Sequence, residues 1–85
     1  MITEDSIFLL KDVGSISISI REIALRKGYT NPNQIVVRTG LHHRVVNRYW
    51  TGEITKPDKQ ILAIFCFLFK CDVNDIIKYN PPKNL

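Results

Sequence analysis

The chain has 85 residues, of which 45% are hydrophobic and 24% charged, and twelve Lys and Arg outweigh eight Asp and Glu to give a net charge of +4. A chain this short forms one domain and buries only about 60–65% of its unfolded surface. That size leaves no room for a large enzyme pocket, and the positive charge favours an anionic partner.

The N-terminal part, residues 1–18, is expected to form a β-hairpin extension. Over residues 15–20 serine alternates with isoleucine, which is the period of a strand with one buried face. A turn signal precedes it at Gly14, and an apolar run at residues 7–10 supplies the other arm. We therefore predict a hairpin over about residues 6–18, which needs a surface to lie on because an isolated hairpin is marginal in water.

The first helix is expected over residues 20–27, where the period changes from two to 3.6. Ser19 and Glu22 have the spacing of a capping box, and Ile18 and Ile23 have the spacing of a hydrophobic staple. These signals predict a sharp helix start.

Two short helices around a tight turn are predicted next. Asn31 can cap the first of them, and Pro32 presets the φ angle of its first turn, so this helix is expected over residues 32–38. Gly40 can adopt the left-handed conformation that ends it. The second helix is then expected over residues 42–50.

The exposed side of this second helix carries the most informative residues. His43, Arg44, Asn47 and Arg48 are spaced i, i+1, i+4 and i+5, so they project to one side. Arg offers a bidentate fork to guanine, Asn pairs with adenine, and His can donate or accept at a base edge. The charge supports a nucleic acid, since residues 26–59 carry a net of +5 and the rest about −1. We predict that these four side chains contact DNA bases in the major groove.

Residues around the two helices suit the phosphates of double-stranded DNA. These predicted phosphate contacts are Asn31, Asn33, Arg38, His42, Thr51 and Lys56. Binding of this kind releases counterions, so we expect the affinity to fall steeply with salt.

Residues 19–79 resemble the lambda-repressor-like helix-turn-helix domain of the Cro/CI and Xre type. On that pattern Gly40 falls at the inter-helix turn, Ile35 at a core position and Gly52 at the end of the recognition helix. The stretch CFLFKCDVNDIIKY, residues 66–79, resembles the family's ending, in which a short fifth helix packs back. The resemblance implies a mainly α, compact five-helix bundle that acts as a sequence-specific transcriptional regulator.

Three positions depart from the family pattern. Pro32 stands where the family often has a Gln that contacts a phosphate, and Val36 stands where a small Ala usually lies at the helix crossing. His42 replaces the usual Ser or Thr cap of the recognition helix, which we expect to cost about 1 kcal/mol. None of these departures removes the fold.

An apolar helix is expected over residues 59–69. Leu62, Phe65, Cys66 and Phe69 match the family's inward positions, but Ile61, Ile64 and Phe67, which the family usually leaves polar, are apolar as well. A helix that is hydrophobic nearly all round is covered on more than one side. We interpret Ile61, Ile64 and Phe67 as a contact with the hairpin of the same chain or with a second subunit.

The expected organisation is an extension at residues 1–18, the DNA-binding domain at residues 19–79 and a tail at residues 80–85. Proteins of this docking class commonly bind as dimers on half-sites about 34 Å apart, so we expect a homodimer. The alternative is an antitoxin-like or protein-partner-binding module on the same fold, which an exposed apolar patch would indicate. We do not expect an enzyme.

No membrane partner is expected, because the longest apolar run, residues 61–69, falls short of the roughly 20 residues that span a bilayer. We therefore expect a cytoplasmic, nucleoid-associated protein in which Cys66 and Cys71 are reduced and buried. The spacing of these cysteines relative to His42 and His43 does not suit zinc, and we expect no metal and no cofactor.

Overall fold

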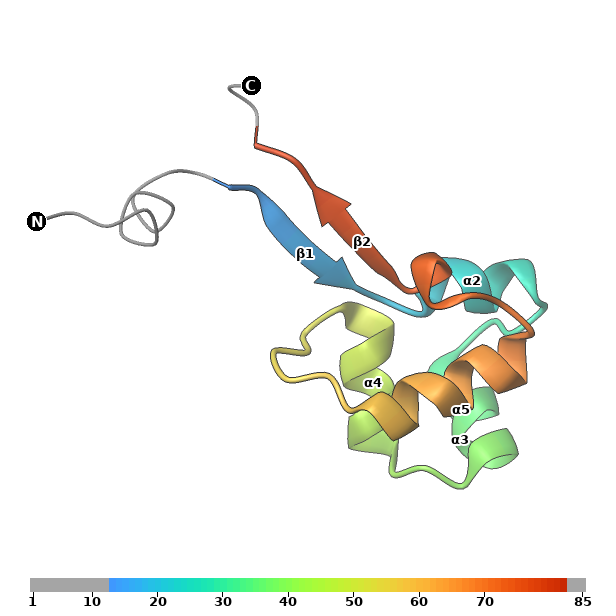
Figure 1. Ribbon diagram of the computed structural model, residues 1–85. Coiled ribbons are helices and arrows are strands. Elements are labelled where there is room, and N and C mark those ends of the chain that lie inside the picture. Colours follow the sequence, from blue (N-terminus) through green and yellow to red (C-terminus); the bar gives the residue numbers. More distant parts are fainter. Residues whose placement is uncertain (1–12, 83–85) are drawn as a thin grey trace, which may run out of the picture.

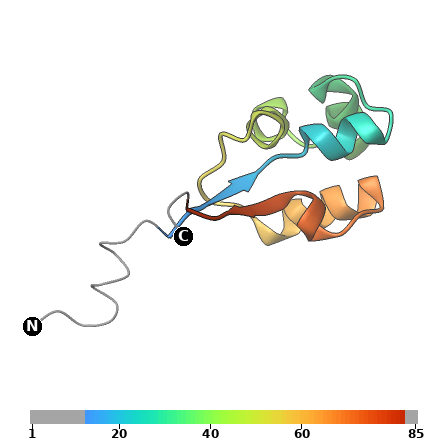
Figure 2. The same ribbon diagram turned by 90° about the horizontal axis from the view of Figure 1, so that it is seen from above.

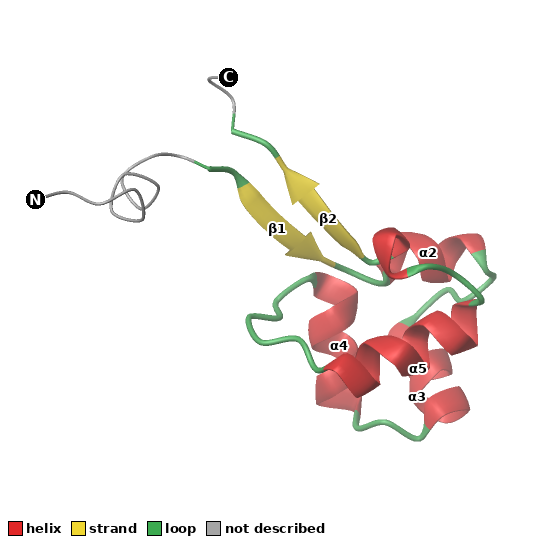
Figure 3. Ribbon diagram, viewed as in Figure 1, coloured by secondary structure: helices red, strands yellow, loops and turns green. Residues whose placement is uncertain are grey.

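The computed structural model of the protein describes residues 13–82. In chain order its elements are β1 (Ser15–Ile18), α2 (Arg21–Arg26), α3 (Pro32–Thr39), α4 (His43–Thr51), α5 (Lys59–Phe69), the 3₁₀ helix η1 (Val73–Asp75) and β2 (Ile77–Asn80). The helices gather into one body, and the two strands leave it side by side as a ribbon (Figures 1 and 3). The prediction of a mainly helical domain is confirmed.

The core lies between the helices and the base of the ribbon. It draws buried apolar side chains from both strand ends and from all four α-helices: Ile18, Ile20, Ile23, Ala24, Ile35, Val46, Tyr49, Phe65, Phe69 and Ile76. The ring of Phe65 contacts those of Tyr49 and Phe69, with centroids 5.1 Å and 6.1 Å apart. Figure 2 shows the elements in two layers, with α2, α3 and α4 on one side and α5 and β2 on the other.

The five-helix bundle is not confirmed, because the described residues form four α-helices. Where a short fifth helix was expected, the chain makes the single turn of η1, closed by a capping box between Asp72 and Asp75, and then enters β2. Pairing with β1 supplies hydrogen bonds to the β2 backbone, and this tertiary contact overrides the weak helical tendency of a short segment.

The ribbon joins the two ends of the described chain. β1 pairs antiparallel with β2, so that Ile16 lies opposite Tyr79 and Ile18 lies opposite Ile77. The predicted strand at the N-terminal end is therefore present, but its described partner is the C-terminal strand. The other arm of the predicted hairpin, residues 6–12, lies outside the described residues.

The ribbon extends beyond the helices, and this changes the predicted burial of β1. Ile18 is buried at the base of the ribbon, whereas Ile16, on the same side of the strand, is 60% exposed. Gly14 has φ +88°, and a Cβ atom there would collide with the carbonyl oxygen of Asn80. Glycine is therefore required for the close approach of the two chain ends.

The helix α2 begins without the predicted capping box. The hydroxyl of Ser19 donates to the carbonyl of Trp50 at 3.1 Å, and the carboxylate of Glu22 accepts from the ammonium of Lys78 at 3.0 Å. Ser19 also accepts from the N–H of Arg21 at 3.3 Å, but the Glu22 carboxylate is used by its contact with β2 and the reciprocal capping box is not formed. The helix bounds themselves lie within one residue of the prediction at each end.

Candidate nucleic-acid interface

The turn between α3 and α4 is built by local capping. The side chain of Asn31 accepts from the backbone N–H of Gln34 at 3.1 Å at the start of α3, and Gly40 ends α3 with φ +75°. At the start of α4, the Nδ1 atom of His42 accepts from the N–H of Arg44 at 3.2 Å. The predicted caps are confirmed, and His42 performs the capping role through its ring.

The end of α4 is held firmly against the rest of the domain. Its side chains Val46 and Tyr49 are buried in the core. The N–H of Ile20 donates to the carbonyl of Tyr49 at 2.9 Å, and the N–H of Asp58 donates to the Tyr49 hydroxyl at 3.0 Å. Contacts with the segments before α2 and before α5 therefore fix the direction in which α4 presents its outer side.

The outer side of α4 carries the four residues predicted to contact bases. His43, Arg44, Asn47 and Arg48 are all exposed. The ion pairs found among residues 13–82 are Arg26 with Asp75 and Lys78 with Glu22, so within this range neither arginine of α4 is paired. Both guanidinium groups can donate to an incoming phosphate or guanine at no cost of breaking an internal ion pair.

A hollow of about 570 Å³ separates the start of α3 from α4. It is lined by Asn31, Pro32, Asn33, Val36, His43 and Asn47. The hollow thus brings two predicted phosphate contacts of α3 next to two predicted base contacts of α4. Its lining combines the apolar Pro32 and Val36 with amide and imidazole side chains that can reach a ligand lying across both helices.

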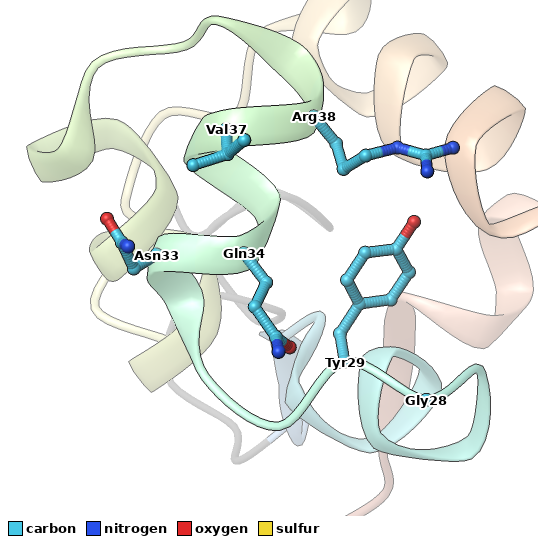
Figure 4. A pocket seen from close by; sticks show the side chains of 6 residues that line it. All are labelled: Gly28, Tyr29, Asn33, Gln34, Val37 and Arg38. Atoms are coloured by element: carbon cyan, nitrogen blue, oxygen red, sulfur yellow. The ribbon is translucent and has the colours of Figure 1, made fainter.

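Arg38 lies elsewhere. It lines a second hollow, of about 370 Å³, together with Gly28, Tyr29, Asn33, Gln34 and Val37. In Figure 4, Arg38 and Asn33 project from opposite sides of α3, and Arg38 extends above the ring of Tyr29. Arg38 therefore shares a hollow with Asn33 but not with His43 or Asn47 of α4.

The two remaining predicted phosphate contacts are Thr51, the last residue of α4, and Lys56 in the loop that follows. The hydroxyl of Thr51 donates to the carbonyl of Asn47 at 3.0 Å and accepts from the N–H of Glu53 at 3.4 Å. Lys56 is exposed in the loop before α5 and has no ion pair within residues 13–82. Thr51 thus shapes the turn after α4, while the Lys56 ammonium is available to solvent or a ligand.

The apolar residues of α5 do not form one uniform surface. Ile61 is half-buried and packs against the core, and Ile64 is half-buried. Phe67 is 87% exposed. The ribbon adds two exposed apolar residues that sequence reasoning missed, since Ile16 is 60% and Tyr79 is 59% exposed. Only knowledge of the β1–β2 pairing places these two side by side.

Residues 13–82 contain neither a metal-binding cluster nor a membrane-spanning helix. No three His, Cys, Asp or Glu side chains of this range are grouped so that they could hold a metal ion. Likewise, no helix within the range has the length and hydropathy needed to cross a membrane.

Comparison with known proteins identifies the segment that contains these helices. The family model for the Cro/C1-type helix-turn-helix (HTH) DNA-binding domain matches residues 19–82. Neither the curated proteins nor the solved structures contain a significant match to the chain. The matched range begins two residues before α2, ends just beyond β2 and includes the whole α3–α4 surface.

Proposed function

The chain belongs to the Cro/C1-type HTH DNA-binding domain family, and we propose that it is a sequence-specific transcriptional regulator that places α4 in the major groove of double-stranded DNA. The observation that carries the proposal is the outer side of α4, with four exposed groups that suit base edges and two arginines outside any ion pair of the described residues. Such a protein acts where the DNA is, in the cytoplasm and on the nucleoid.

Roles divide by position around α4. Arg44, Asn47 and Arg48 carry the forked or amide donors that distinguish guanine and adenine, and His43 assists at a neighbouring base. Asn31 and Asn33 share a hollow with His43 and Asn47, which suits a phosphate of the strand that crosses from α3 to α4. Lys56 adds a phosphate contact from the following loop. Binding involves no chemical step.

The division of roles is tested with Arg48→Ala and Lys56→Ala. Fluorescence anisotropy measures the Kd of each variant for the preferred duplex and for a scrambled duplex. We expect Arg48→Ala to weaken the preferred duplex by about ten- to a hundredfold and the scrambled duplex much less, because base contacts specify the sequence. Lys56→Ala should weaken both duplexes alike and reduce the slope of log K against log salt by about 0.9.

Arg21→Ala is the matched control, since Arg21 is exposed on α2 and has no ion pair within residues 13–82. It should leave both affinities near those of the parent protein. Equal losses on both duplexes for Arg48→Ala and Lys56→Ala would contradict the separation of base contact from phosphate contact.

We also propose that the protein binds DNA as a homodimer. The support is the exposed apolar surface of the ribbon, where Ile16 and Tyr79 lie opposite each other, together with Phe67 on α5. A two-stranded ribbon is marginally stable by itself, so covering it with the ribbon of a second copy stabilises both. Two α4 helices related by a two-fold axis would then reach half-sites about 34 Å apart.

Light scattering after gel filtration at tens of micromolar tests this assembly. The parent protein should run as a dimer, and Ile16→Thr should shift it towards monomer if the ribbon is the interface. Phe67→Gln should do so if α5 is the interface. Val37→Gln is the control, because Val37 is 75% exposed on α3 and belongs to neither the ribbon nor α5.

A parent protein that stays monomeric would contradict the dimer. In that case the exposed Phe67 would favour the second candidate function, an antitoxin-like module that binds a protein partner.

A further inference from the structure

The only two cysteines of the chain lie together at the end of α5. Lys70 has φ +51°, which reverses the chain after the helix, and the N–H of Cys71 then donates to the carbonyl of Cys66 at 3.1 Å. This is the outer hydrogen bond of a Schellman cap, and the side chains of the two residues that it joins commonly meet in an apolar contact. Here the position of that contact is occupied by two thiols.

The Cys66 thiol affects the ionisation of the Cys71 thiol. Burial, together with the charge of Cys66 and a side-chain hydrogen bond with it, raises the pKa of the Cys71 thiol to about 11. Both cysteines are free and half-buried. A pair of thiols in this relation can be joined with little movement of the backbone, because the cap already holds the two residues at close range.

Cys71 opens onto a hollow of about 260 Å³ whose lining is mainly charged. The hollow is lined by Ile23, Arg26, Lys27, Lys70, Cys71 and Asp75. Arg26 is paired with Asp75 at 3.7 Å, which leaves Lys27 and Lys70 as positive charges outside any ion pair of the described residues. The hollow therefore suits a small reagent with negative charge.

We propose that Cys66 and Cys71 form a dithiol modification site that reacts with a small anionic disulfide, such as glutathione disulfide, and closes to an intramolecular disulfide. The site lies where α5 ends beside α2 and η1, outside the α3–α4 surface (Figure 1). It is independent of the DNA-binding function proposed above, and modification there does not require α4 to be free of DNA.

The reaction proceeds by two thiol–disulfide exchanges. The Cys71 thiolate attacks one sulfur of the reagent, the reagent's S–S bond breaks, and one glutathione leaves as a thiolate that takes up a proton. Cys66 then loses its proton and attacks the Cys71 sulfur, which releases the second glutathione. The two protein thiols lose two electrons and two protons, and the reagent is reduced to two thiols.

The full-length protein with glutathione disulfide is followed by intact mass and by counting free thiols. We expect the loss of two hydrogens and a fall from two free thiols to none, with a single transient adduct. Cys66→Ser should stop at a stable mixed disulfide on Cys71. The rate should rise about tenfold per pH unit above neutrality, because the thiolate is the nucleophile and the Cys71 pKa is raised.

Reagent charge supplies a matched control. Cystamine, a disulfide that carries positive charge, should react more slowly than glutathione disulfide, and the double change Lys27→Gln with Lys70→Gln should remove this difference. Any one of three results would overturn the proposal: a parent protein that stops at the mixed disulfide, disulfide bonds formed only between chains, or thiols that react only after denaturation in urea.

Discussion

The α3–α4 pair and the β1–β2 ribbon are stabilised in opposite ways. The first is local, since each helix has its own cap and a tight turn at Gly40 joins the two. The second is non-local, since its strands come from opposite ends of the described chain. The exposed surfaces also differ, because α4 presents His, Arg and Asn while the ribbon presents Ile16 and Tyr79. The polar surface of α4 and the apolar surface of the ribbon therefore lie on separate elements of one small domain.

The largest effect should come from breaking the ribbon at Gly14. Gly14→Ala places a Cβ against the Asn80 carbonyl at a residue with φ +88°, so we expect a loss of about 2–4 kcal/mol in the free energy of unfolding from strain and overpacking. Gly28→Ala is the control. Gly28 has φ +93° and no atom within 4 Å of its Cβ position, so this variant reports backbone strain alone.

Urea unfolding of the two glycine variants measures how much more stability Gly14→Ala loses than Gly28→Ala. If Gly14→Ala costs no more than Gly28→Ala, the close approach of the chain ends does not contribute to stability in solution. If the ribbon pairing is independent of the α3–α4 pair, the amide NMR signals of α4 should shift little in Gly14→Ala.

The hydroxyl groups of Tyr49 and Tyr79 allow the hydrogen bonds of the helical body and of the ribbon to be compared. The Tyr49 hydroxyl accepts from the Asp58 N–H in a part-buried setting, whereas the Tyr79 hydroxyl donates to the Val13 carbonyl in an exposed one. We expect Tyr49→Phe to lower the free energy of unfolding by about 1 kcal/mol because it leaves the part-buried N–H of Asp58 without its acceptor. Tyr79→Phe should cost less, since water replaces its hydrogen bond. Equal losses in thermal melts would contradict this order.

The smallest effect concerns the ion pair that joins α2 to β2. Hydrogen bonding to the Lys78 ammonium, and the charge of that group, hold the pKa of Glu22 below its ordinary value of 4.5. The pair therefore stabilises the folded state above the ordinary pKa, and its contribution is lost as pH falls through the lowered pKa. The effect is slight because the pair is exposed.

Thermal melts between neutral pH and pH 3 test the contribution of this pair. We expect the Tm difference between the parent protein and Glu22→Gln to shrink with acid. Lys78→Gln should remove the dependence on Glu22, and a difference that grows with acid would contradict the sign.

The parts of the fold that were predictable are those with local signals. The cap at Asn31, the turn at Gly40 and the helix end at Gly52 each depend on a preference of one residue for one backbone conformation. The bounds of α5 follow equally from its apolar run. Since α4 is amphipathic and its buried side is set by Val46 and Tyr49, the exposure of its polar side could also be predicted.

The parts that were not predictable depend on tertiary partners. The capping box at Ser19 and Glu22 fails because Lys78 binds the Glu22 carboxylate, while the Ser19 hydroxyl donates to Trp50 and accepts from the N–H of Arg21, not from that of Glu22. A separate failure concerns β2, because a four-residue strand is specified by pairing with β1 and not by its own sequence.

The position of the Arg38 side chain could not be predicted from the sequence either. The direction of a side chain on α3 becomes clear only once the hollow beside Tyr29 is known. The sequence also does not predict which apolar residues of α5 are buried, because Ile61 packs against the core while Phe67 is exposed.

Selection of bound sequences from a random duplex pool, at low and at moderate salt, tests most directly whether α4 reads DNA sequence. We predict enrichment of a two-fold symmetric motif with half-sites about one helical turn apart, and its loss in Arg48→Ala. Salt-sensitive binding without an enriched motif would contradict sequence-specific recognition. Absence of binding at both salt concentrations would contradict DNA binding by the α3–α4 surface altogether.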